Sequence, residues 1–346
     1  MEILKNCSLR EYNTFGVDTT ANVFVKYSSE DELLAFLEQY HKEMNQIPLM
    51  HIGCGSNLLF LSDFNGVILF SKIKDITILS EDEDTVQVSV GAGITLDDFV
   101  LYAIQHGWYG LENLSLIPGQ IGSSAVQNVG AYGVEAGDLI NSVQTISLEE
   151  GANRNWNHDE LSYAYRYSIF KDEAFRGKYA ICRVVFQLKK QFTPCLNYGG
   201  LKASLQDKQI QPEELSAMQL RDIIIDIREK KLPNPKVMGN AGSFFMNPIV
   251  SIDFFRLIQE HYSSVPFYEV DAEHVKVPAG WLIEQCGLKG KSIGPVAVHD
   301  KQALVLVNTG GATGKDILSL CRVVQQSVLE KFGIQLHPEV NFIGEV

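Results

Sequence analysis

The chain has 346 residues, of which 45% are hydrophobic and 21% are charged, ordinary values for a globular protein. One hydrophobic core rarely organises a chain of this length, so we expect two or three domains. The formal net charge is −13. Proteins that bind phosphate backbones normally present a basic face, so neither nucleic acid nor an anionic membrane is expected as the main partner.

The cysteines and the amino terminus exclude further classes. The six cysteines form no C-x-x-C pair, and no His/Cys cluster has zinc spacing. We therefore expect no metal site and no disulfide framework. The amino terminus lacks the apolar segment of a secretion signal, and no apolar run approaches the length of a membrane span. We expect a cytoplasmic protein that does not associate with a membrane.

Predicted helices and strands mix along the chain without regular alternation. Helices are expected after the capping residues Ser29, Thr95 and Thr313, the last of them ending at Gly333. Strands are expected over 47–52, 66–70, 73–79, 85–90, 140–148, 180–188 and 303–307. The irregular order indicates an α+β fold rather than a doubly wound sheet.

A domain boundary is predicted after a helix over 212–231. The following stretch, Leu232-Pro-Asn-Pro-Lys-Val-Met-Gly239, brings two prolines and a glycine within eight residues. We place the boundary near Arg228.

Glycine turns in the first half are candidates for ligand binding. They are Gly53-Cys-Gly-Ser-Asn57, Gly91-Ala-Gly93 and the stretch 117–133. Consecutive amides in such turns form an anion-binding concavity, and neighbouring Ser and Asn side chains add neutral donors, a composition that suits a diphosphate. Tight turns between strands are the alternative, and for 91–93 they are favoured. No dinucleotide-binding fingerprint or P-loop occurs, which disfavours a Rossmann domain.

Three side chains are candidates for chemistry. Ser243 lies in Gly239-Asn-Ala-Gly-Ser-Phe-Phe-Met-Asn-Pro248, where its hydroxyl is either a positioned group or a turn residue. The motif is not a G-x-S-x-G elbow, so an acyl-transfer nucleophile is not indicated. Arg166 lies among three tyrosines, where stacking at the surface is the alternative. Glu339 lies in a strand-like tail and could simply face solvent.

Taken together, these segments resemble one known family. They are Asn13-Thr-Phe-Gly16, Gly53-x-Gly-Ser-Asn57, Gly110-Leu-Glu-Asn113, the 117–133 stretch, Tyr165-Arg166, Gly239-Asn-Ala-Gly-Ser-Phe-Phe245 and Pro338-Glu339. In this order they closely resemble the UDP-N-acetylenolpyruvoylglucosamine reductase family, nearly from end to end. Residues 191–200 look like the inserted tyrosine loop of its type I members.

The resemblance implies a fold and a division into domains. The fold is α+β, with a two-part non-Rossmann FAD-binding module of the p-cresol methylhydroxylase type and a smaller α+β substrate domain. The implied FAD-binding subdomains cover 1–70 and 71–213, the second carrying the tyrosine loop. The implied substrate domain covers 228–333, and residues 334–346 form a strand that returns Glu339 to the active site.

The resemblance also implies a reaction. NADPH reduces FAD, and the flavin then reduces UDP-N-acetylglucosamine enolpyruvate to UDP-N-acetylmuramate, a peptidoglycan precursor. Arg166 would stabilise the enol-like dianion, because a planar and permanently charged guanidinium suits that role. Ser243 would protonate the intermediate in a closed site, and Glu339 would assist at the carboxylate, in its protonated form.

The resemblance also implies which residues of this chain contact the cofactor and the substrate. Those implied for FAD are Gly53, Gly55, Ser56, Asn57, Ile117, Pro118, Gly119, Gly122, Ser123, Gln127, Asn128 and Gly130. Those implied for the sugar nucleotide are Tyr132, Tyr198, Lys231, Asn247, Tyr268 and Gln302. Two residues depart from the family pattern: Cys54 replaces glycine or glutamate, and Met246 replaces a frequent lysine.

Two other functions remain open at this point. One is an oxidase on the same module, which could tether its flavin through Cys54 or His51. The other is a non-catalytic nucleotide-binding descendant, against which the intact Arg166, Ser243 and Glu339 argue. We expect small-molecule partners only, and a monomer.

Overall fold

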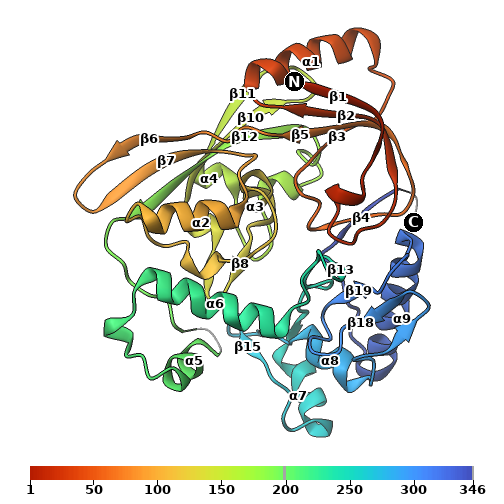
Figure 1. The fold of residues 1–346 in the computed structure, drawn as a ribbon. Helices are drawn as coiled ribbons and strands as arrows, with labels where there is room; N and C mark the ends of the chain where they lie inside the picture. Colours follow the sequence, from red (N-terminus) through yellow and green to blue (C-terminus); the bar gives the residue numbers. More distant parts are fainter. Residues whose placement is uncertain (198–199, 345–346) are drawn as a thin grey trace. The chain divides into compact units, whose positions relative to one another are not determined.

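The chain forms two compact units, each assembled from separate segments. The computed structural model describes residues 1–197 and 200–344 (Figure 1). The first unit comprises Met1–Cys7, Ala21–Cys54 and Asn65–Arg228, and the second comprises Ser8–Thr20, Gly55–Phe64 and Glu229–Val346. Both units combine helices with parallel and antiparallel strand pairs, which confirms the α+β class.

The first unit contains two main sheets. One has the order β1 (Glu2–Ser8), β2 (Thr20–Tyr27), β5 (Phe64–Ser71), β3 (Leu49–Ile52). The other is antiparallel, with the order β11 (Asn153–Asn157), β10 (Ile140–Ser147), β12 (Tyr179–Lys189), β7 (Thr85–Gly91), β6 (Ile76–Glu81). A small hairpin joins β8 (Gly130–Ala131) to β9 (Val134–Glu135). The helices are α1 (Glu30–Glu43), α2 (Leu96–Gln105), α3 (Ile121–Gln127), α4 (His158–Leu161), α5 (Leu201–Asp207) and α6 (Ala217–Lys231).

Capping side chains start the helices where the sequence predicts. The Ser29 hydroxyl accepts the amide of Glu32 at the start of α1, and Thr95 accepts that of Asp98 at the start of α2. Strands β6 and β7 form a hairpin, whose acidic turn is held by the Asp82 carboxylate. Figure 1 shows this hairpin extending from the first unit.

Helices and strands of the first unit pack around two cores. Helices α2 and α3 cover one face of the five-stranded sheet, where Phe99 packs against Phe186 at 5.2 Å between ring centroids. On the other face, Ile146 and Cys182 pack with Phe36 of α1 and Val67 of β5. The central strands β10 and β12 are buried on both faces, and the sheet supports the glycine turn 117–130 through α3, which contacts β12.

The second unit is built around the long helix α9 (Gly314–Phe332). Its sheets have the orders β13 (Gly239–Asn240), β19 (Leu306–Asn308), β18 (Val296–Val298), β17 (Ser292–Ile293), and β14 (Ile249–Ser251), β16 (His274–Lys276), β15 (Tyr268–Glu269). Strand β20 (Asn341–Ile343) pairs in parallel with β4 (Leu58–Phe60). The other helices are α7 (Ile252–His261) and α8 (Ala279–Gln285).

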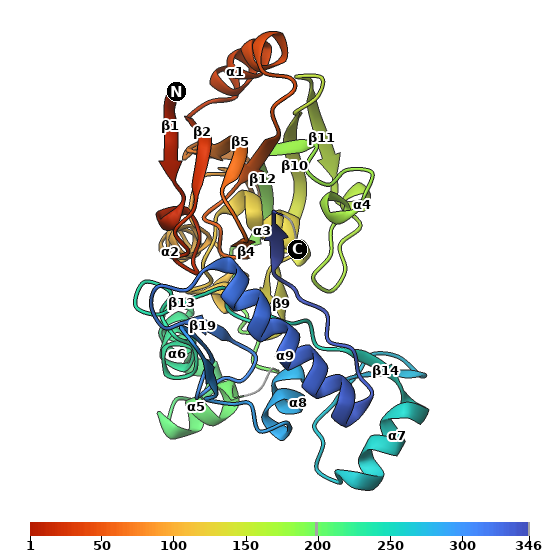
Figure 2. The same cartoon turned by 90° about the vertical axis from the view of Figure 1, so that its right-hand side faces the viewer.

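Helix α9 has the predicted ends, with Thr313 as its N-cap and Gly333 as its left-handed C-cap. It lies against β18 and β19, and Figure 2 shows it beside β19. The strand predicted over 303–307 is partly wrong. Val305 donates its amide to the Gln302 carbonyl in a turn, so the strand begins only at Leu306.

Two early segments of the chain belong to the second core. Phe15 and Leu59 are fully buried there, with Phe244, Val324 and Leu336. The division into compact units therefore differs from the expected continuous ranges, because Ser8–Thr20 and Gly55–Phe64 join the carboxyl-terminal half.

Candidate functional site

The loop after β3 is held by close backbone packing. A Cβ at Gly53 would lie 3.3 Å from both the Cβ and the Oγ of Ser123, so the structure brings these two predicted cofactor residues together in the first unit. Gly55 has φ +64°, and a Cβ there would lie 2.0 Å from the Tyr12 carbonyl oxygen. Only glycine fits this position.

The 117–130 turn contains both satisfied and unsatisfied polar groups. The amides of Ile121 and Gly122 donate to the carbonyls of Ile94 and Ala92, so these two donors hold the turn against the sheet. The Ser123 hydroxyl exchanges hydrogen bonds with Gln120 at 3.0 and 2.8 Å. The Oε1 atom of Gln127, in contrast, is buried without a protein partner. A buried acceptor of this kind is costly unless a ligand supplies a donor.

The Gly91-Ala-Gly93 turn is structural, as the sequence favoured. A Cβ at Gly91 would lie 2.4 Å from the Ile73 carbonyl oxygen, and one at Gly93 would lie 2.6 Å from that of Ser71. These glycines allow the chain to pass close to the end of β5.

A tight turn presents Arg166. Ala164 and Tyr167 exchange backbone hydrogen bonds of 3.2 and 2.9 Å, and Arg166 between them has φ +55°. Its Nη2 donates to the Gly130 carbonyl at 2.9 Å, and its guanidinium lies 5.3 Å from the Tyr165 ring centroid. The structure therefore joins the arginine to the glycine turn, 36 residues earlier in the chain.

Tyr132 is held from two sides within the first unit. The Asn113 amide donates to the Tyr132 carbonyl at 2.8 Å. Burial raises the pKa of the Tyr132 phenol, and the Arg228 guanidinium, which hydrogen-bonds the Tyr132 side chain, partly offsets that rise. Burial lowers the pKa of Arg228. The Gly110–Asn113 motif thus supports a predicted substrate residue through the backbone.

Helix α6 is anchored by an ion pair. Arg221 donates from both terminal nitrogens to the Asp97 carboxylate, at 2.6 and 2.9 Å. Burial alone would raise the pKa of Asp97, but the Arg221 guanidinium and the Leu116 amide hold it below its usual range. Arg221 and Arg228 are seven residues apart and share a helix face. This spacing is visible in the sequence and is the signal that could have identified the two arginines, which were not predicted to be functional residues.

Ser243 is presented by a turn with buried anchors. Phe244 and Phe245 are almost fully buried, whereas Ser243 is exposed. The Asn240 side chain accepts the Gly242 amide at 2.9 Å and donates to the carbonyls of Pro233 and Met238. The Gly-Ser-Phe-Phe motif therefore combines core packing with an outward-facing hydroxyl.

Glu339 lies on a backbone segment paired with that of Ser243. Its amide donates to the Phe244 carbonyl at 2.8 Å, and Met246 donates to His337 at 2.9 Å. The Asn57 amide group donates to the Glu339 carbonyl at 3.1 Å. The second unit thus brings together Ser243, Glu339 and the predicted cofactor residue Asn57.

Four of the predicted substrate residues, Lys231, Asn247, Tyr268 and Gln302, lie in the second unit. Asn247 accepts the Ala279 amide at 2.9 Å, and Tyr268 lies on the edge strand β15, with Lys276 Nζ 5.9 Å from its ring centroid. The Gln302 carbonyl caps the turn before β19, and Lys231 is the exposed last residue of α6. Tyr198 lies outside the described residues.

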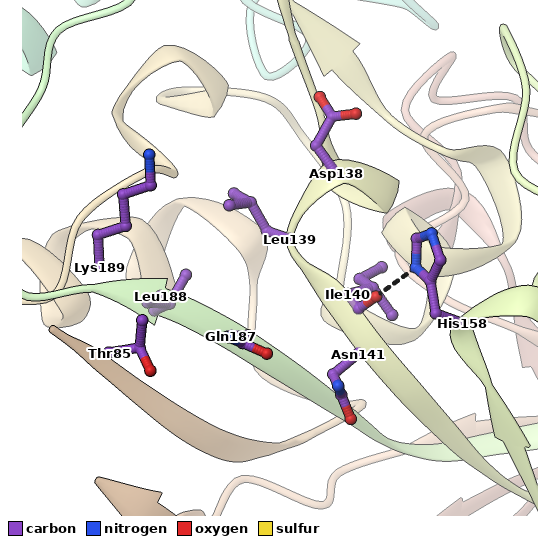
Figure 3. Close-up of a pocket in the computed structure, with 9 residues that line it drawn as sticks. All are labelled: Thr85, Asp138, Leu139, Ile140, Asn141, His158, Gln187, Leu188 and Lys189. Atoms are coloured by element: carbon purple, nitrogen blue, oxygen red, sulfur yellow. Dashed lines mark hydrogen bonds between the residues drawn. The ribbon is translucent and has the colours of Figure 1, made fainter. Parts of the chain in front are cut away.

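A cavity of about 320 Å³ lies at the ends of β7, β10 and β12 (Figure 3). Its lining contains no predicted site residue. Two of its polar side chains already bond to protein: His158 Nδ1 lies 2.8 Å from the Ile140 carbonyl oxygen, and Asp138 accepts the Glu135 amide.

The described part of the chain has neither a group of metal-binding side chains nor a helix suited to span a membrane. Within 1–197 and 200–344, no three His, Cys, Asp or Glu side chains are grouped so that they could hold a metal ion. Over the same ranges, no helix is both long enough and apolar enough to cross a membrane.

Comparison with known proteins first defines a class. Residues 21–152 match a family model described as an FAD binding domain. With the α+β fold and the buried unpaired acceptor of Gln127, this match makes the chain an FAD-binding flavoprotein of the oxidoreductase class.

The family follows from the rest of the chain. Residues 234–343 match the model of the UDP-N-acetylenolpyruvoylglucosamine reductase C-terminal domain. Relatives carrying that enzyme name include proteins from Bacteroides fragilis (strain YCH46), 50% identical over 97% of this chain and 98% of the relative, and Porphyromonas gingivalis (strain ATCC 33277), 44% identical over 99% and 100%. The chain therefore belongs to the UDP-N-acetylenolpyruvoylglucosamine reductase family.

A solved structure supports the fold. The reductase of this name from Thermus caldophilus aligns with a TM-score of 0.66 and 24% identity, covering 99% of this chain and 98% of that one. Both units of the present chain thus have counterparts in a single solved structure.

Proposed function

We propose that this chain reduces UDP-N-acetylglucosamine enolpyruvate to UDP-N-acetylmuramate at the expense of NADPH, with Arg166, Ser243 and Glu339 as its reactive residues. Family membership over nearly the whole chain supports the reaction. The observation that carries the residue assignment is the pairing of the Ser243 and Glu339 segments through the hydrogen bond of 2.8 Å from Glu339 N to Phe244 O.

The groups that would hold FAD lie at the glycine turns. Gln127 offers a buried acceptor with no protein partner, which fits the hydroxyl and N–H donors of FAD. Gly53 and Ser123, from two of these turns, lie together. When bound there, FAD carries a hydride from NADPH to the enolpyruvyl group.

Arg166 would stabilise charge that develops next to the substrate carboxylate. A guanidinium stays protonated at any working pH, and its fork binds two oxygens at once. The left-handed backbone and the bond to Gly130 fix its direction before substrate binds. Such a preorganised cation stabilises a transition state without reorganisation during the reaction.

Ser243 would deliver the proton to carbon. Its neighbours Phe244 and Phe245 are anchored in the core, so the hydroxyl sits on a rigid support. A serine hydroxyl is a weak acid, but an enolate is a strong base, which makes the transfer feasible where water is excluded.

Glu339 would act at the substrate carboxylate as a neutral acid. Its backbone is held by Phe244 on one side and Asn57 on the other. A carboxyl group that remains protonated in a closed site can donate a hydrogen bond to an anion.

The sugar nucleotide would be held by residues of several elements. Lys231 suits a diphosphate as a point charge, the Asn247 amide is oriented by Ala279, and the exposed Tyr268 ring can cover an apolar face. Tyr132, Tyr198 and Gln302 complete this set, and small molecules are the partners.

We also propose that the chain acts as a monomer in the cytoplasm, where NADPH and nucleotide sugars are available. Sedimentation analysis at micromolar concentration is expected to give a single species of about 38.6 kDa, the mass of one chain.

One assay tests the reaction. The purified protein should show a flavin spectrum and should oxidise NADPH rapidly only when UDP-N-acetylglucosamine enolpyruvate is added. Absence of substrate-dependent turnover would overturn the proposal.

Two other outcomes identify the alternatives. The tethered oxidase would be indicated by flavin that remains with acid-precipitated protein and by fast reoxidation with oxygen. Against tethering through His51, its Nε2 already lies 2.8 Å from the Tyr27 hydroxyl oxygen. A protein that does not bind FAD on reconstitution would indicate the non-catalytic descendant.

A further inference from the structure

The backbone of Arg166 needs external support. Its φ of +55° lies in the left-handed region, which is strained for a non-glycine residue. Such a conformation persists only where neighbouring groups hold it. The Lys171 ammonium provides one contact by donating to the Arg166 carbonyl at 2.6 Å.

Asn128 supplies the support on the other side of the turn. Its side chain is 1% exposed and makes three hydrogen bonds. Its Nδ2 donates to the Ala164 carbonyl at 2.9 Å and to Glu135 Oε2 at 2.7 Å, and its Oδ1 accepts the Gly137 amide at 2.8 Å. Both amide hydrogens therefore go to protein acceptors, which leaves the Asn128 side chain no donor for a cofactor.

These bonds connect the two segments that flank the arginine. Ala164 begins the turn that contains Arg166, and Glu135 pairs with Gly130 in the β8–β9 hairpin. Gly130 in turn accepts a hydrogen bond from Arg166. A Cβ at Gly130 would lie 2.9 Å from Glu135 Cγ and 3.2 Å from Arg166 Nη1, so both side chains pass close to this glycine. Asn128 thus ties the backbone of the turn to the hairpin that receives the guanidinium.

We propose that Asn128, together with the Glu135 carboxylate that orients it, is a positioning residue for Arg166 rather than a contact to FAD. This inference rests on the proposed function only for the role of Arg166. A cation aimed at developing charge loses its effect when its direction changes, and a displacement of about 1 Å can slow a reaction about 100-fold.

The test separates the two half-reactions in the holoenzyme by stopped flow. Asn128→Gly deletes the amide but tolerates the left-handed φ of +42°. We expect it to slow the half-reaction with the enolpyruvyl substrate at least ~10-fold and to change flavin reduction by NADPH less than about twofold. Glu135→Gln, which keeps an acceptor for Asn128, should retain most of the rate, whereas Glu135→Ala should resemble Asn128→Gly.

A double-mutant cycle shows whether the effect passes through Arg166. In an Arg166→Lys background, where the guanidinium fork is absent, Asn128→Gly should add little further slowing. A readout that does not depend on turnover is amide hydrogen exchange, which should accelerate at 164–167 in Asn128→Gly.

Asn308 is the matched control. It is also buried and makes three side-chain hydrogen bonds, to Phe15, Gly310 and Ala312 in the second unit. Asn308→Ala should lower the melting temperature comparably but leave both half-reactions unchanged.

Three results would overturn the inference. They are additive slowing in the cycle, equal slowing of both half-reactions by Asn128→Gly, and weakened FAD binding with normal exchange at 164–167. Wild-type protein that binds flavin but lacks substrate turnover would instead refute the proposed function, and with it the role of Arg166 on which this inference depends.

Discussion

At the scale of single residues, chemistry depends on side chains whose backbone is rigidly held. Arg166 has a left-handed conformation, and Ser243 follows Gly242, which has φ +67°. The left-handed backbone of Arg166 persists only with support from its surroundings, whereas Gly242 adopts a positive φ without strain. The hydrogen bonds of Asn240 and the burial of Phe244 hold the turn that carries the serine. The proposed role of Ser243 therefore depends on Asn240 and Phe244, which position it.

The first prediction concerns the proton donor. Ser243→Ala should leave flavin reduction by NADPH near the wild-type rate and slow product formation about 10²- to 10⁴-fold, because only the second step needs a proton at carbon. Stopped-flow absorbance measures both steps. Ser264→Ala, at another exposed serine of the second unit, is the control and should behave like wild type. Unchanged product formation in Ser243→Ala would remove this residue from the mechanism.

The second prediction concerns pH. Burial lowers the pKa of His51 to about 4. The unfolded chain binds a proton near pH 6.5, so the native state loses stability as the pH falls from about 6.5 toward 4. The urea midpoint of the wild type should therefore decrease between pH 7.5 and pH 5 more than that of His51→Gln, which keeps a polar partner for Tyr27. Parallel decreases in both proteins would show that His51 is charged in the folded state.

At the scale of elements, helix α6 shows how one ion pair positions a segment that carries a predicted substrate residue and a contact to another. It contains Arg228, which contacts Tyr132, and it ends at Lys231. Arg221 is almost buried, and its fork binds Asp97 at the start of α2. The pair links the two helices within the first unit.

The third prediction tests that link. Arg221→Met should destabilise the protein by about 2 kcal/mol at pH 7, because it leaves a half-buried carboxylate without its main partner. The pKa of Asp97 is lowered in the folded state, so this contribution exists above about pH 4 and disappears as the pH falls through the lowered value. Urea unfolding at pH 7 and pH 3.5 measures the difference.

A double variant provides the control for the ion pair. Asp97→Asn combined with Arg221→Met should recover most of the stability, since no unpaired charge is then buried. If the double variant is no more stable than Arg221→Met, the ion pair is not the source of the effect.

At the scale of the whole molecule, each compact unit is discontinuous in sequence. The second unit takes Phe15 and Leu59 into its core and pairs β4 with β20. Its carboxyl-terminal part, which matches a family model by itself, thus lacks several core side chains and a strand partner. We therefore expect this unit to fold only when Ser8–Thr20 and Gly55–Phe64 are present with its carboxyl-terminal part.

The fourth prediction follows from that composition. The fragment 229–346 should remain unfolded alone, because exposed apolar surface and unpaired strand edges oppose independent folding. Expressed together with fragment 1–228, it should fold and yield a flavin-containing complex. Circular dichroism of the isolated fragment measures the first outcome, and a cooperative thermal transition in that fragment would contradict it.

Much of the local structure was predictable from sequence. Capping boxes located α1, α2 and α9, and branched residues located β5, β7, β10 and β12, because these signals act over a few neighbouring residues. The strand predicted over 303–307 was wrong at residues 303–305 because the signal used for it is also local. Val305 is apolar and buried like a strand residue, yet a backbone bond to Gln302 places it in a turn.

The motifs by themselves determined the family and the cofactor and predicted the reactive side chains, since short glycine, serine and arginine patterns are specific in sequence. Tertiary structure decided what those motifs do. In the folded chain the Asn128 amide donates to Ala164 and Glu135. Arg221 and Arg228 are directed toward the protein interior, and Ser8–Thr20 packs with the carboxyl-terminal half. Sequence spacing reports only on neighbours along the chain, whereas burial and hydrogen-bond partners depend on segments up to hundreds of residues away.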